Sequence, residues 1–472
     1  MRKERQNIQR QFRLPLVRTT NGAGETQNDR IVDAEVRAAE PTTESPSAAP
    51  ETGPTMEEVL DRSNLFAALK HVHQNKGAAG ADKMPLSELD SFLKAHWLEI
   101  KAQLLDGSYE PQPVRRVEIA KADGGKRQLG IPTVLDRLIQ QALLQILQRR
   151  WDGGFSEGSY GFRPRRSAHM AVAQAQQYVS AGLLWVVDTD LEKFFDRVNH
   201  DILMSKVAAR VSDKRILKLI RRYLTAGALL PDGVVSERSE GTPQGGPLSP
   251  LLANLLLDGF DKELERRGHR FVRYADDCNI YVHSERAGQR VMQSITNWLE
   301  HKLKLRVNLK KSAVALATSR DFLGFRLCHN EQRDAIERGI APSAIVRAKN
   351  RIRELTPRRR GQKLSDTVKQ VGNYLRGWWG YFGHAEQTRE AQQIASWTRR
   401  RLRQMQWIQW KTAKNRRRQL VRLGCSKKTA RNTAATGAGP WRIARSPGMH
   451  YALNNAYWYN LGLPNIGPAN TG

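Results

Sequence analysis

The chain has 472 residues, of which 40% are hydrophobic and 26% charged, with a formal net charge of +30. This length and composition exclude a wholly disordered chain and leave room for two or three domains with cores of their own. So strong a positive charge favours a polyanionic partner, and nucleic acid is the first candidate. Three cysteines, none in a CxxC pair, argue against a disulfide framework and against a cysteine-based zinc site.

The N-terminal residues 1–55 are predicted to be a disordered arm. Residues 19–55 are rich in Thr, Glu, Pro and Ser and hold few large apolar residues, so they cannot bury enough surface to offset their ordering entropy. The Arg-rich start resembles a transit peptide, but Glu4 and the acidic stretch that follows favour an exposed arm. No apolar run is long enough to cross a membrane, so we expect an intracellular protein without membrane contact.

Folded structure is expected to begin near Met56. Helical spacing covers residues 86–105, where Ser87 is the expected cap, and then 134–152, 250–267 and 287–303. Residues 115–132 read as two strands around an Asp-Gly-Gly turn, and 183–191 as a buried strand. This order of mixed α and β elements predicts an α+β domain, which an all-helical part follows.

The part from residue 341 to the end differs in composition from the rest. It holds 26 Lys and Arg against 4 Asp and Glu, and seven of the 11 Trp. Its pattern is helical almost throughout, with breaks at TPRRRGQ (356–362) and near Gly424. Such a density of Trp argues against a merely solvated tail, so we interpret it as a binding module attached to an enzyme.

Two pairs of aspartates interrupt apolar strands. The strand LLWVVDTDL ends on Asp188 and Asp190, which alternation places on one face. Asp276 and Asp277 lie within FVRYADDCNIYV, where alternation sends them to opposite faces, so only one, Asp276 in our interpretation, shares a face with Asp190. Each pair alone is explained by a turn or a strand-end ion pair. Together, in so basic a chain, they favour carboxylates that hold Mg²⁺ for chemistry at phosphorus.

These segments carry a family resemblance. FVRYADDCNIYV (271–282) resembles the YxDD hairpin of reverse transcriptases, and VVDTDLEKFFDRVNHDIL (186–203) resembles the strand, turn and helix with their other metal-binding aspartate. GTPQGGPLSPLLANLLLD (241–258) resembles the loop and helix between these motifs. Four further blocks resemble motifs of group II intron-encoded reverse transcriptases and their maturase domain: NKGAAGAD, GIPTVLDRLIQQALLQ, SYGFRPRRSAHMAV and VGNYLRGWWGYFGH. The likeness runs from about residue 64 to near the end.

The resemblance implies an α+β right-hand polymerase with fingers, a palm with an antiparallel sheet, and an all-α thumb and maturase domain. Its parts would be 56–110 as an N-terminal extension of the fingers, 111–330 as fingers and palm, 341–424 as thumb and maturase, and 425–472 as a basic DNA-binding tail. Many relatives add an endonuclease domain, which we do not expect in this bacterial-type chain.

The resemblance also implies residue roles in the palm. Asp190 and Asp276 would hold two Mg²⁺ ions, the carbonyl of Leu191 would complete one coordination sphere, and Asp277 would support the site. Asp188 has no metal role in this register. Family members carry a bulky residue five positions after the first metal aspartate, which from Asp190 gives Phe195.

Nucleotide-binding roles follow in the same way. Lys121 and Arg127 would bind the triphosphate of the incoming deoxynucleotide, Phe195 would exclude a ribose 2′-hydroxyl, and Gln244 would face the nascent base pair. Without the resemblance, Lys121 and Arg127 lie on a solvated hairpin, Phe195 is a core residue, and Gln244 belongs to an ordinary Gly-rich loop.

The resemblance makes the basic C-terminal part the binding region for group II intron RNA, with target DNA as a further partner. The arginines that we expect to contact RNA are Arg376, Arg399, Arg400, Arg401, Arg416, Arg417 and Arg418. For each Trp between them, helix packing is the favoured interpretation. The expected location is the bacterial cytoplasm, in association with the nucleoid, and homodimer formation is left open.

Two other functions compete with an intron-encoded enzyme. Reverse transcriptases of retron, diversity-generating or phage-defence type typically lack the YLRGWWGYF block, so its presence counts against them. An RNA chaperone with a decayed polymerase fold should have lost its metal aspartates first, and Asp190, Asp276 and Asp277 are all present.

Overall fold

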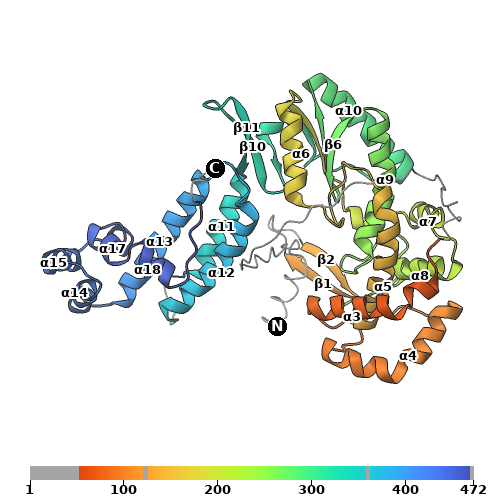
Figure 1. Cartoon of the computed structure of the whole chain (residues 1–472), viewed down its shortest axis with the longest axis horizontal. Coiled ribbons are helices and arrows are strands. Elements are labelled where there is room, and N and C mark those ends of the chain that lie inside the picture. Colours follow the sequence, from red (N-terminus) through yellow and green to blue (C-terminus); the bar gives the residue numbers. More distant parts are fainter. Residues whose placement is uncertain (1–52, 121–125, 358–361, 468–472) are drawn as a thin grey trace, which may run out of the picture. The chain divides into compact units, whose positions relative to one another are not determined.

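The computed structural model describes residues 53–120, 126–357 and 362–467, so most of the predicted arm 1–55 lies outside the described residues. The chain forms two compact units (Figure 1). The first unit comprises the chain up to Phe155 and Lys193–Leu257, and the second comprises Ser156–Glu192 and the chain from Asp258 on. Each unit is described by itself below.

The first unit combines helices with a four-stranded sheet of order β2-β1-β4-β5. Its helices are α2 (Met56–Val59), α3 (Arg62–Asn75), α4 (Leu89–Asp106), α5 (Val134–Trp151), α7 (His200–Ala208), α8 (Lys214–Thr225) and the first half of α9 (Ser249–Arg266). Its strands are β1 (Val114–Ala120), β2 (Lys126–Ile131), β4 (Ala228–Leu229) and β5 (Val235–Ser236). Short 3₁₀ turns span Leu86–Glu88, Asp152–Gly154 and Phe194–Asp196.

Local sequence explains these elements. β1 and β2 pair antiparallel from Arg115 opposite Ile131 to Ala120 opposite Lys126, which confirms the predicted hairpin, although its Asp-Gly-Gly turn lies outside the described residues. The predicted helix 134–152 is confirmed as α5, and the Thr133 side chain caps it by accepting a hydrogen bond from a backbone N–H of its first turn.

The predicted cap of α4 is wrong. The helix begins at Leu89, and Glu88 is its N-cap residue, without a side-chain hydrogen bond. Ser87 lies inside the preceding 3₁₀ turn, Leu86–Glu88, so its backbone is already helical. A capping serine needs an extended backbone to reach the free N–H groups of the first turn, and Ser87 does not have one.

The second unit contains a four-stranded antiparallel sheet of order β6-β7-β3-β8, which we call the palm sheet. Its strands are β3 (Trp185–Thr189), β6 (Arg270–Tyr274), β7 (Asp277–Val282) and β8 (Ala313–Leu316). The helices α6 (Ala168–Ser180) and α10 (Glu285–Trp298) pack on it, and a π-helical turn, Leu299–Leu303, continues α10 (Figure 1).

The palm sheet is covered on both faces. On one face α6 packs in a core with Val186 and Tyr281. On the other, Gly288 of α10 lies so close to Val187 and Val314 that an added Cβ would come within 2.4 Å of the Val314 side chain. Both faces of β3 are therefore apolar, which explains why the strand is a continuous run of large apolar residues before its aspartates.

A three-stranded sheet and the C-terminal helices complete the second unit. Its strands, in the order β11-β10-β9, are β9 (Asp321–Phe322), β10 (Phe325–Asn330) and β11 (Ala335–Ile340). The helices are α11 (Pro342–Leu355), α12 (Leu364–Phe382), α13 (Arg389–Gln409), α14 (Ala413–Arg422), α15 (Lys427–Ala435), α16 (Pro440–Ile443), α17 (Pro447–Ala452) and α18 (Asn455–Asn460).

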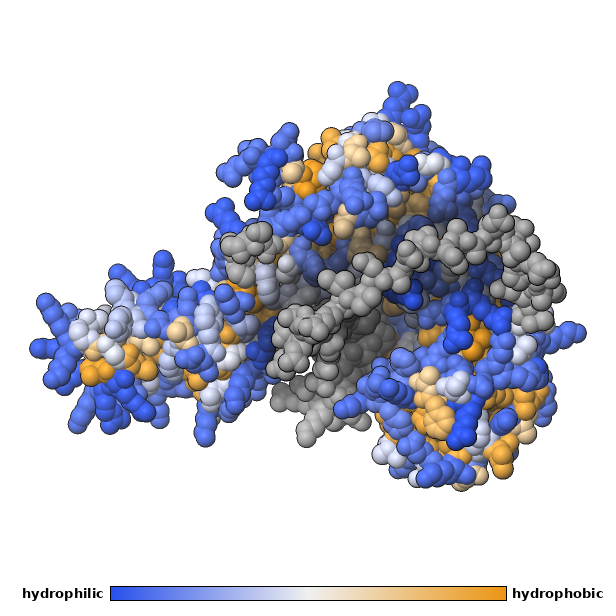
Figure 2. Space-filling view, in the orientation of Figure 1, coloured by the Kyte–Doolittle hydropathy of each residue, from blue (hydrophilic) through white to orange (hydrophobic). Residues whose placement is uncertain are grey.

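The C-terminal helices share one apolar core, which includes Trp378, Trp407, Trp410 and Trp458 as buried residues. Packing, the favoured interpretation for the tryptophans between the arginines, is confirmed at Trp378, Trp407 and Trp410. The predicted breaks are confirmed between α11 and α12 and between α14 and α15. The surface of α14, α15 and α17 is mostly hydrophilic (Figure 2). Among the described residues, no helix is both long and apolar enough to span a membrane.

Candidate active site

The two central aspartates lie at the tip of the β6–β7 hairpin. Tyr274 pairs with Asp277, so Ala275 and Asp276 form the turn between the strands. Ala275 has a φ of 60°, the left-handed region that a residue with a Cβ adopts at a cost of about 1–2 kcal/mol. Asp276 is half-buried in the turn, outside the regular pleat, so the alternation that we used to separate it from Asp277 does not apply.

The neighbouring strand delivers the third carboxylate to the same end of the sheet. The β3–β7 ladder ends on the pair Thr189–Cys278, and Asp190 and Asp277 are the next residues on their strands. Desolvation, followed by repulsion from Asp276, Asp190 and Asp188, raises the pKa of Asp277 to about 7, although the residue is exposed at the surface. The structure thus brings Asp190, Asp276 and Asp277 together.

A loop after α10 holds Asp190 in place. The Asn308 side chain donates to Asp190 Oδ2 at 3.0 Å, and the Asn308 backbone N–H donates to the Asp190 carbonyl at 2.8 Å. The Asp190 N–H donates to Ser312 Oγ at 3.0 Å. Lys311 Nζ lies 3.8 Å from Asp190 Oδ2. Leu191, which is buried, continues this contact through an antiparallel bridge with Val307.

Asp188 has a different environment. Its Oδ2 accepts hydrogen bonds from Arg320 Nε at 2.9 Å and Nη2 at 2.6 Å. The same guanidinium donates to the Lys311 carbonyl at 2.8 Å, which joins β3 to the segment after β8. An aspartate engaged in this way has a structural partner, and this favours the register that begins at Asp190.

The carboxylates at the hairpin tip suit a divalent cation. They offer only oxygen donors, which hard cations such as Mg²⁺ prefer, and their mutual repulsion is relieved when a cation binds. As the side chains stand, the described part of the chain contains no group of three or more acidic, His or Cys residues arranged to hold a metal ion. The residues nevertheless fit a cation in the kind of donor that they offer, and two or three carboxylates suffice because Mg²⁺ keeps several waters.

The predicted nucleotide-binding residues fall in the first unit. Phe194 is buried, whereas Phe195 is half-buried, with ring centroids 5.1 Å apart. The Phe195 carbonyl accepts a hydrogen bond from Thr242 N–H at 2.7 Å, and the Gln244 carbonyl accepts one from Gly130 N–H at 2.8 Å. The Gly-rich loop thus connects the Phe195 segment to strand β2.

The other two predicted nucleotide-binding residues belong to the β1–β2 hairpin region. Arg127 lies on β2, opposite Ile119 of β1. Lys121 lies outside the described residues. Their predicted contact with a triphosphate stays a prediction.

The predicted RNA-binding arginines divide into two groups. Three of them donate to backbone carbonyls from distant parts of the sequence: Arg400 to Trp441 at 3.0 Å, Arg401 to Thr356 at 2.8 Å, and Arg376 to Gly462 at 2.9 Å. The other four arginines differ in exposure: Arg399 and Arg416 are half-buried, whereas Arg417 and Arg418 are exposed on α14.

Sequence reasoning missed Arg273, Asp261, Asn308 and Gly161. Arg273 and Asp261 form a fully buried ion pair, and Gly161 contacts the hairpin turn. A signal was present for the pair, since Arg273 stands in the apolar strand FVRY and Asp261 in the apolar helix LLLDGFDKEL. Charges are rarely fully buried unless they are paired. Asn308 carried no comparable signal.

Comparison with known proteins identifies the class. A family model for reverse transcriptase (RNA-dependent DNA polymerase) matches residues 119–327, and one for the group II intron maturase-specific domain matches 345–424. Protein YkfC of Escherichia coli is 32% identical over 62% of this chain and 87% of its own length. Group II intron-encoded protein LtrA of Lactococcus lactis is 38% identical over 44% of this chain and 34% of its own length. The solved structure "Partial Cas6-RT-Cas1--Cas2 complex" is 24% identical, with 52% of this chain and 42% of that chain covered and a TM-score of 0.34.

The antiparallel palm sheet, its YxDD hairpin and the first family match define a reverse transcriptase, an RNA-directed DNA polymerase. The chain belongs to the family of group II intron-encoded reverse transcriptases and maturases. This confirms the predicted fold, an α+β right-hand polymerase that an all-α part follows. The maturase-specific match separates the chain from the other reverse transcriptase classes considered above.

Proposed function

We propose that this chain binds the group II intron RNA that encodes it, assists the splicing of that RNA, and copies it into DNA during intron mobility. The observation that carries the proposal is the convergence of Asp190, Asp276 and Asp277 at one end of the palm sheet, in a chain that also has a maturase-specific domain. Deoxynucleoside triphosphates and target DNA are the further substrates. The bacterial cytoplasm, at the nucleoid, is the proposed location.

In the palm, the carboxylates of Asp190 and Asp276 and the carbonyl of Leu191 would hold two Mg²⁺ ions. When bound, these ions neutralise the charge that develops as a primer 3′-hydroxyl attacks the nucleotide α-phosphorus. Asn308 orients the Asp190 carboxylate through the 3.0 Å hydrogen bond. Asp277, the next residue after Asp276, would support the site beside these ligands.

In the first unit, Phe195 would select the sugar. Its ring rests against the buried Phe194, and its backbone is fixed by the hydrogen bond from Thr242 N–H. We expect a ring in this position to exclude a ribose 2′-hydroxyl. The backbone bond between Gly130 and Gln244 fixes the loop from which the Gln244 side chain would face the nascent base pair, and Lys121 and Arg127 would bind the triphosphate.

RNA binding would involve the C-terminal helices. Arg417 and Arg418 are exposed on α14, close in sequence to Lys414 and Arg422, so this surface offers several cations to phosphates. Arg376, Arg399, Arg400, Arg401 and Arg416 would contribute with the part of each guanidinium that the protein does not use.

The test pairs two assays on one preparation. The purified chain, with its intron RNA, is assayed for splicing in the presence and absence of protein, and then for DNA synthesis from a primer annealed to that RNA. We expect both activities in the unaltered protein, and Asp276→Asn should lose only synthesis. Splicing assistance without any synthesis by the unaltered protein would contradict the polymerase role and favour the RNA chaperone.

A further inference from the structure

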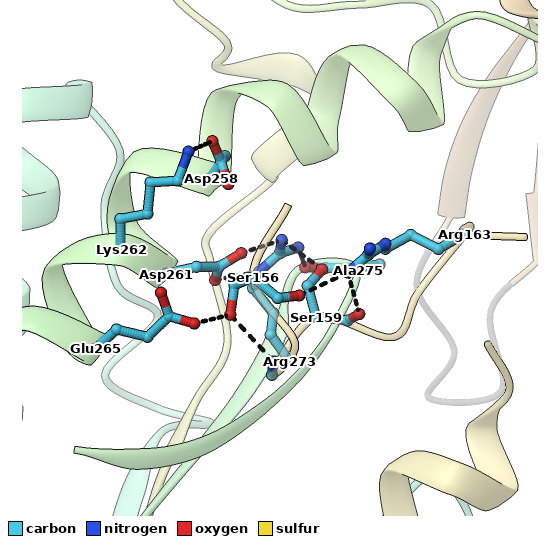
Figure 3. A network of polar contacts seen from close by, with 10 residues as sticks. Ser156, Ser159, Arg163, Asp258, Asp261, Lys262, Glu265, Arg273 and Ala275 are labelled. Carbon is cyan, nitrogen blue, oxygen red and sulfur yellow. Dashed lines mark hydrogen bonds and ion pairs between the residues drawn. The ribbon is translucent and has the colours of Figure 1, made fainter. Parts of the chain in front are cut away.

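Arg273, a fully buried arginine on β6, lies next to the β6–β7 turn that contains Asp276. Arg273 of β6 is 1% exposed and Asp261 of α9 is 0% exposed. Arg273 Nε donates to Asp261 Oδ1 at 2.6 Å, and Nη2 donates to Oδ2 at 2.5 Å (Figure 3). Burial disfavours the charged guanidinium, but the Asp261 carboxylate outweighs it, so the pKa of Arg273 lies above its usual value.

The remaining donors of Arg273 reach the catalytic turn and its surroundings. Nη1 donates to the carbonyl of Ala275 at 2.8 Å, and Nη2 also donates to Ser159 Oγ at 2.8 Å (Figure 3). One rigid guanidinium therefore connects helix α9, the loop that contains Ser159, and the residue immediately before Asp276. An ammonium group could not make this set of bonds, because it lacks the planar fork of N–H donors.

The loop that contains Ser159 supports the same turn from its other side. Tyr160 N–H donates to the Arg273 carbonyl and Arg273 N–H donates to the Gly158 carbonyl, each at 2.8 Å. Gly161 follows, and a Cβ added there would lie 2.3 Å from the Ala275 backbone nitrogen. Only glycine allows so close an approach between this loop and the turn.

The turn requires such support. Ala275 has a φ of 60°, and such a backbone persists in a residue other than glycine only where the surroundings hold it. The Arg273 hydrogen bond to the Ala275 carbonyl and the contact with Gly161 are two such restraints, and Asp276 is the next residue. A rotation of the Ala275–Asp276 peptide would move the carboxylate that the proposed function assigns to the metal ions.

We propose that Arg273 is a positioning residue for DNA synthesis: anchored by Asp261 and Ser159, it fixes the Ala275 carbonyl and so holds Asp276 where it binds the divalent cations. This inference rests on the proposed function, because it assumes that Asp276 is a metal ligand. It differs from a purely stabilising role, because it predicts a defect confined to the hairpin tip.

Two kinds of variant separate position from stability. Arg273→Lys keeps a positive charge beside Asp261 but cannot bond the turn, Ser159 and Asp261 together. The double variant Arg273→Met, Asp261→Leu removes both buried charges, so neither is left unpaired. For each we expect kcat to fall on the order of ten- to a hundredfold, as for a reacting group displaced by about 1 Å. The KM for the primer–template should stay within about twofold, because the contacts to nucleic acid are unchanged.

Two readouts report the hairpin directly. The Mg²⁺ concentration that gives half-maximal synthesis should rise several-fold. In the absence of Mg²⁺ and nucleic acid, hydrogen–deuterium exchange should increase in peptides that contain residues 274–278 and stay at the wild-type level in α10. Gly161→Ala, which leaves the ion pair intact, should produce the same two changes, because its Cβ displaces the turn from the loop side.

Arg267→Lys is the matched control. Arg267 also pairs with α9, through Glu263 at 2.7 Å, and its other side-chain hydrogen bond is to Ser294 of α10, away from the β6–β7 turn. Arg267→Lys should keep the wild-type kcat and Mg²⁺ dependence.

Two outcomes would overturn the proposal. One is a loss of synthesis only in proportion to the unfolded fraction, and the other is a wild-type Mg²⁺ midpoint in the Arg273 variants. Asp276→Asn in the same series tests the function itself: full synthesis by that variant would refute the site, whatever Arg273 does.

Discussion

The palm sheet and the C-terminal helices use charged residues in different ways. In the palm, the position of each acidic residue sets its surroundings: Asp188 within β3 pairs with Arg320, whereas Asp190, Asp276 and Asp277 lie at the sheet's end. In the C-terminal helices, some arginines make contacts inside the protein, whereas others close to them in sequence are exposed at the surface. Position in the sheet therefore distinguishes candidate functional residues more sharply than a high density of one charge does.

The internal arginines of the helices show why composition misleads there. Arg401 donates to the Thr356 hydroxyl and carbonyl, each at 2.8 Å, just after the C-terminus of α11, where carbonyls lack partners and a positive charge is favoured. The Arg400 guanidinium lies 3.9 Å from the Trp441 ring centroid, and that of Arg416 lies 4.4 Å from Trp407. Part of the positive charge thus holds the helices together.

The largest expected effect tests the palm side of this comparison. Asp190→Asn should lower the rate of template-directed DNA synthesis by roughly a thousandfold or more, because the charge proposed to hold the cations is lost. Asp188→Asn should retain most of the activity, since its partner is Arg320. Single-turnover primer extension at saturating primer–template measures both.

The same pair of variants can break the comparison. If Asp188→Asn were inactive and Asp190→Asn active, strand register would have misassigned the metal ligand. RNA binding should be nearly unchanged in either variant, and this serves as the control for folding.

The sequence predicted the palm well because its elements obey local rules. The strand that ends on Asp188 and Asp190 is apolar on both sides, so its pattern placed it, and the family resemblance indicated the hairpin at YADD. Alternation gave the wrong account of Asp276, because this residue lies in the two-residue turn and not on a strand. The role of Arg273 could not be predicted in this way, because its partners Asp261 and Ser159 are 12 and 114 residues away in sequence. The predicted cap at Ser87 is wrong because this residue lies inside a 3₁₀ turn before α4, where its backbone is already helical.

The second prediction extends the comparison to the first unit, where two adjacent phenylalanines differ in burial. Phe195→Ala should increase the use of ribonucleotides relative to deoxyribonucleotides by about tenfold, because deletion of a half-buried ring opens space for a 2′-hydroxyl. Phe194→Ala, at the fully buried neighbour, should lower the melting temperature instead. Competition between the two kinds of nucleotide in primer extension measures the first effect. Unchanged discrimination in Phe195→Ala would make it a core residue as well.

The third prediction concerns the internal arginines. Arg401→Ala should destabilise the protein by about 1–3 kcal/mol, because the Thr356 carbonyl loses its charged donor. Thermal unfolding should detect this as a lower melting temperature. Arg417→Ala, at an exposed position on α14, should leave the melting temperature unchanged. Equal effects of the two substitutions would remove the distinction between internal and surface arginines.

The smallest expected effect is the one that most directly concerns RNA. Each phosphate contact to single-stranded RNA contributes about −0.7 to the slope of log K against log salt, because a bound cation releases counterions. The double variant Arg417→Ala, Arg418→Ala should therefore flatten the slope for intron RNA by about 1.4 if both side chains contact phosphate.

Arginines of α13 provide the comparison. The sequence alone predicted phosphate contacts for Arg399, Arg400 and Arg401 as well, but these three are half-buried, and Arg400 and Arg401 already bond backbone carbonyls. We therefore expect Arg400→Ala to change the slope less than the double variant does. A binding series between low and physiological salt, with melting temperatures as the control, compares them. If the slope were unchanged in the double variant and flatter in Arg400→Ala, the RNA-binding face would lie along α13 instead of α14.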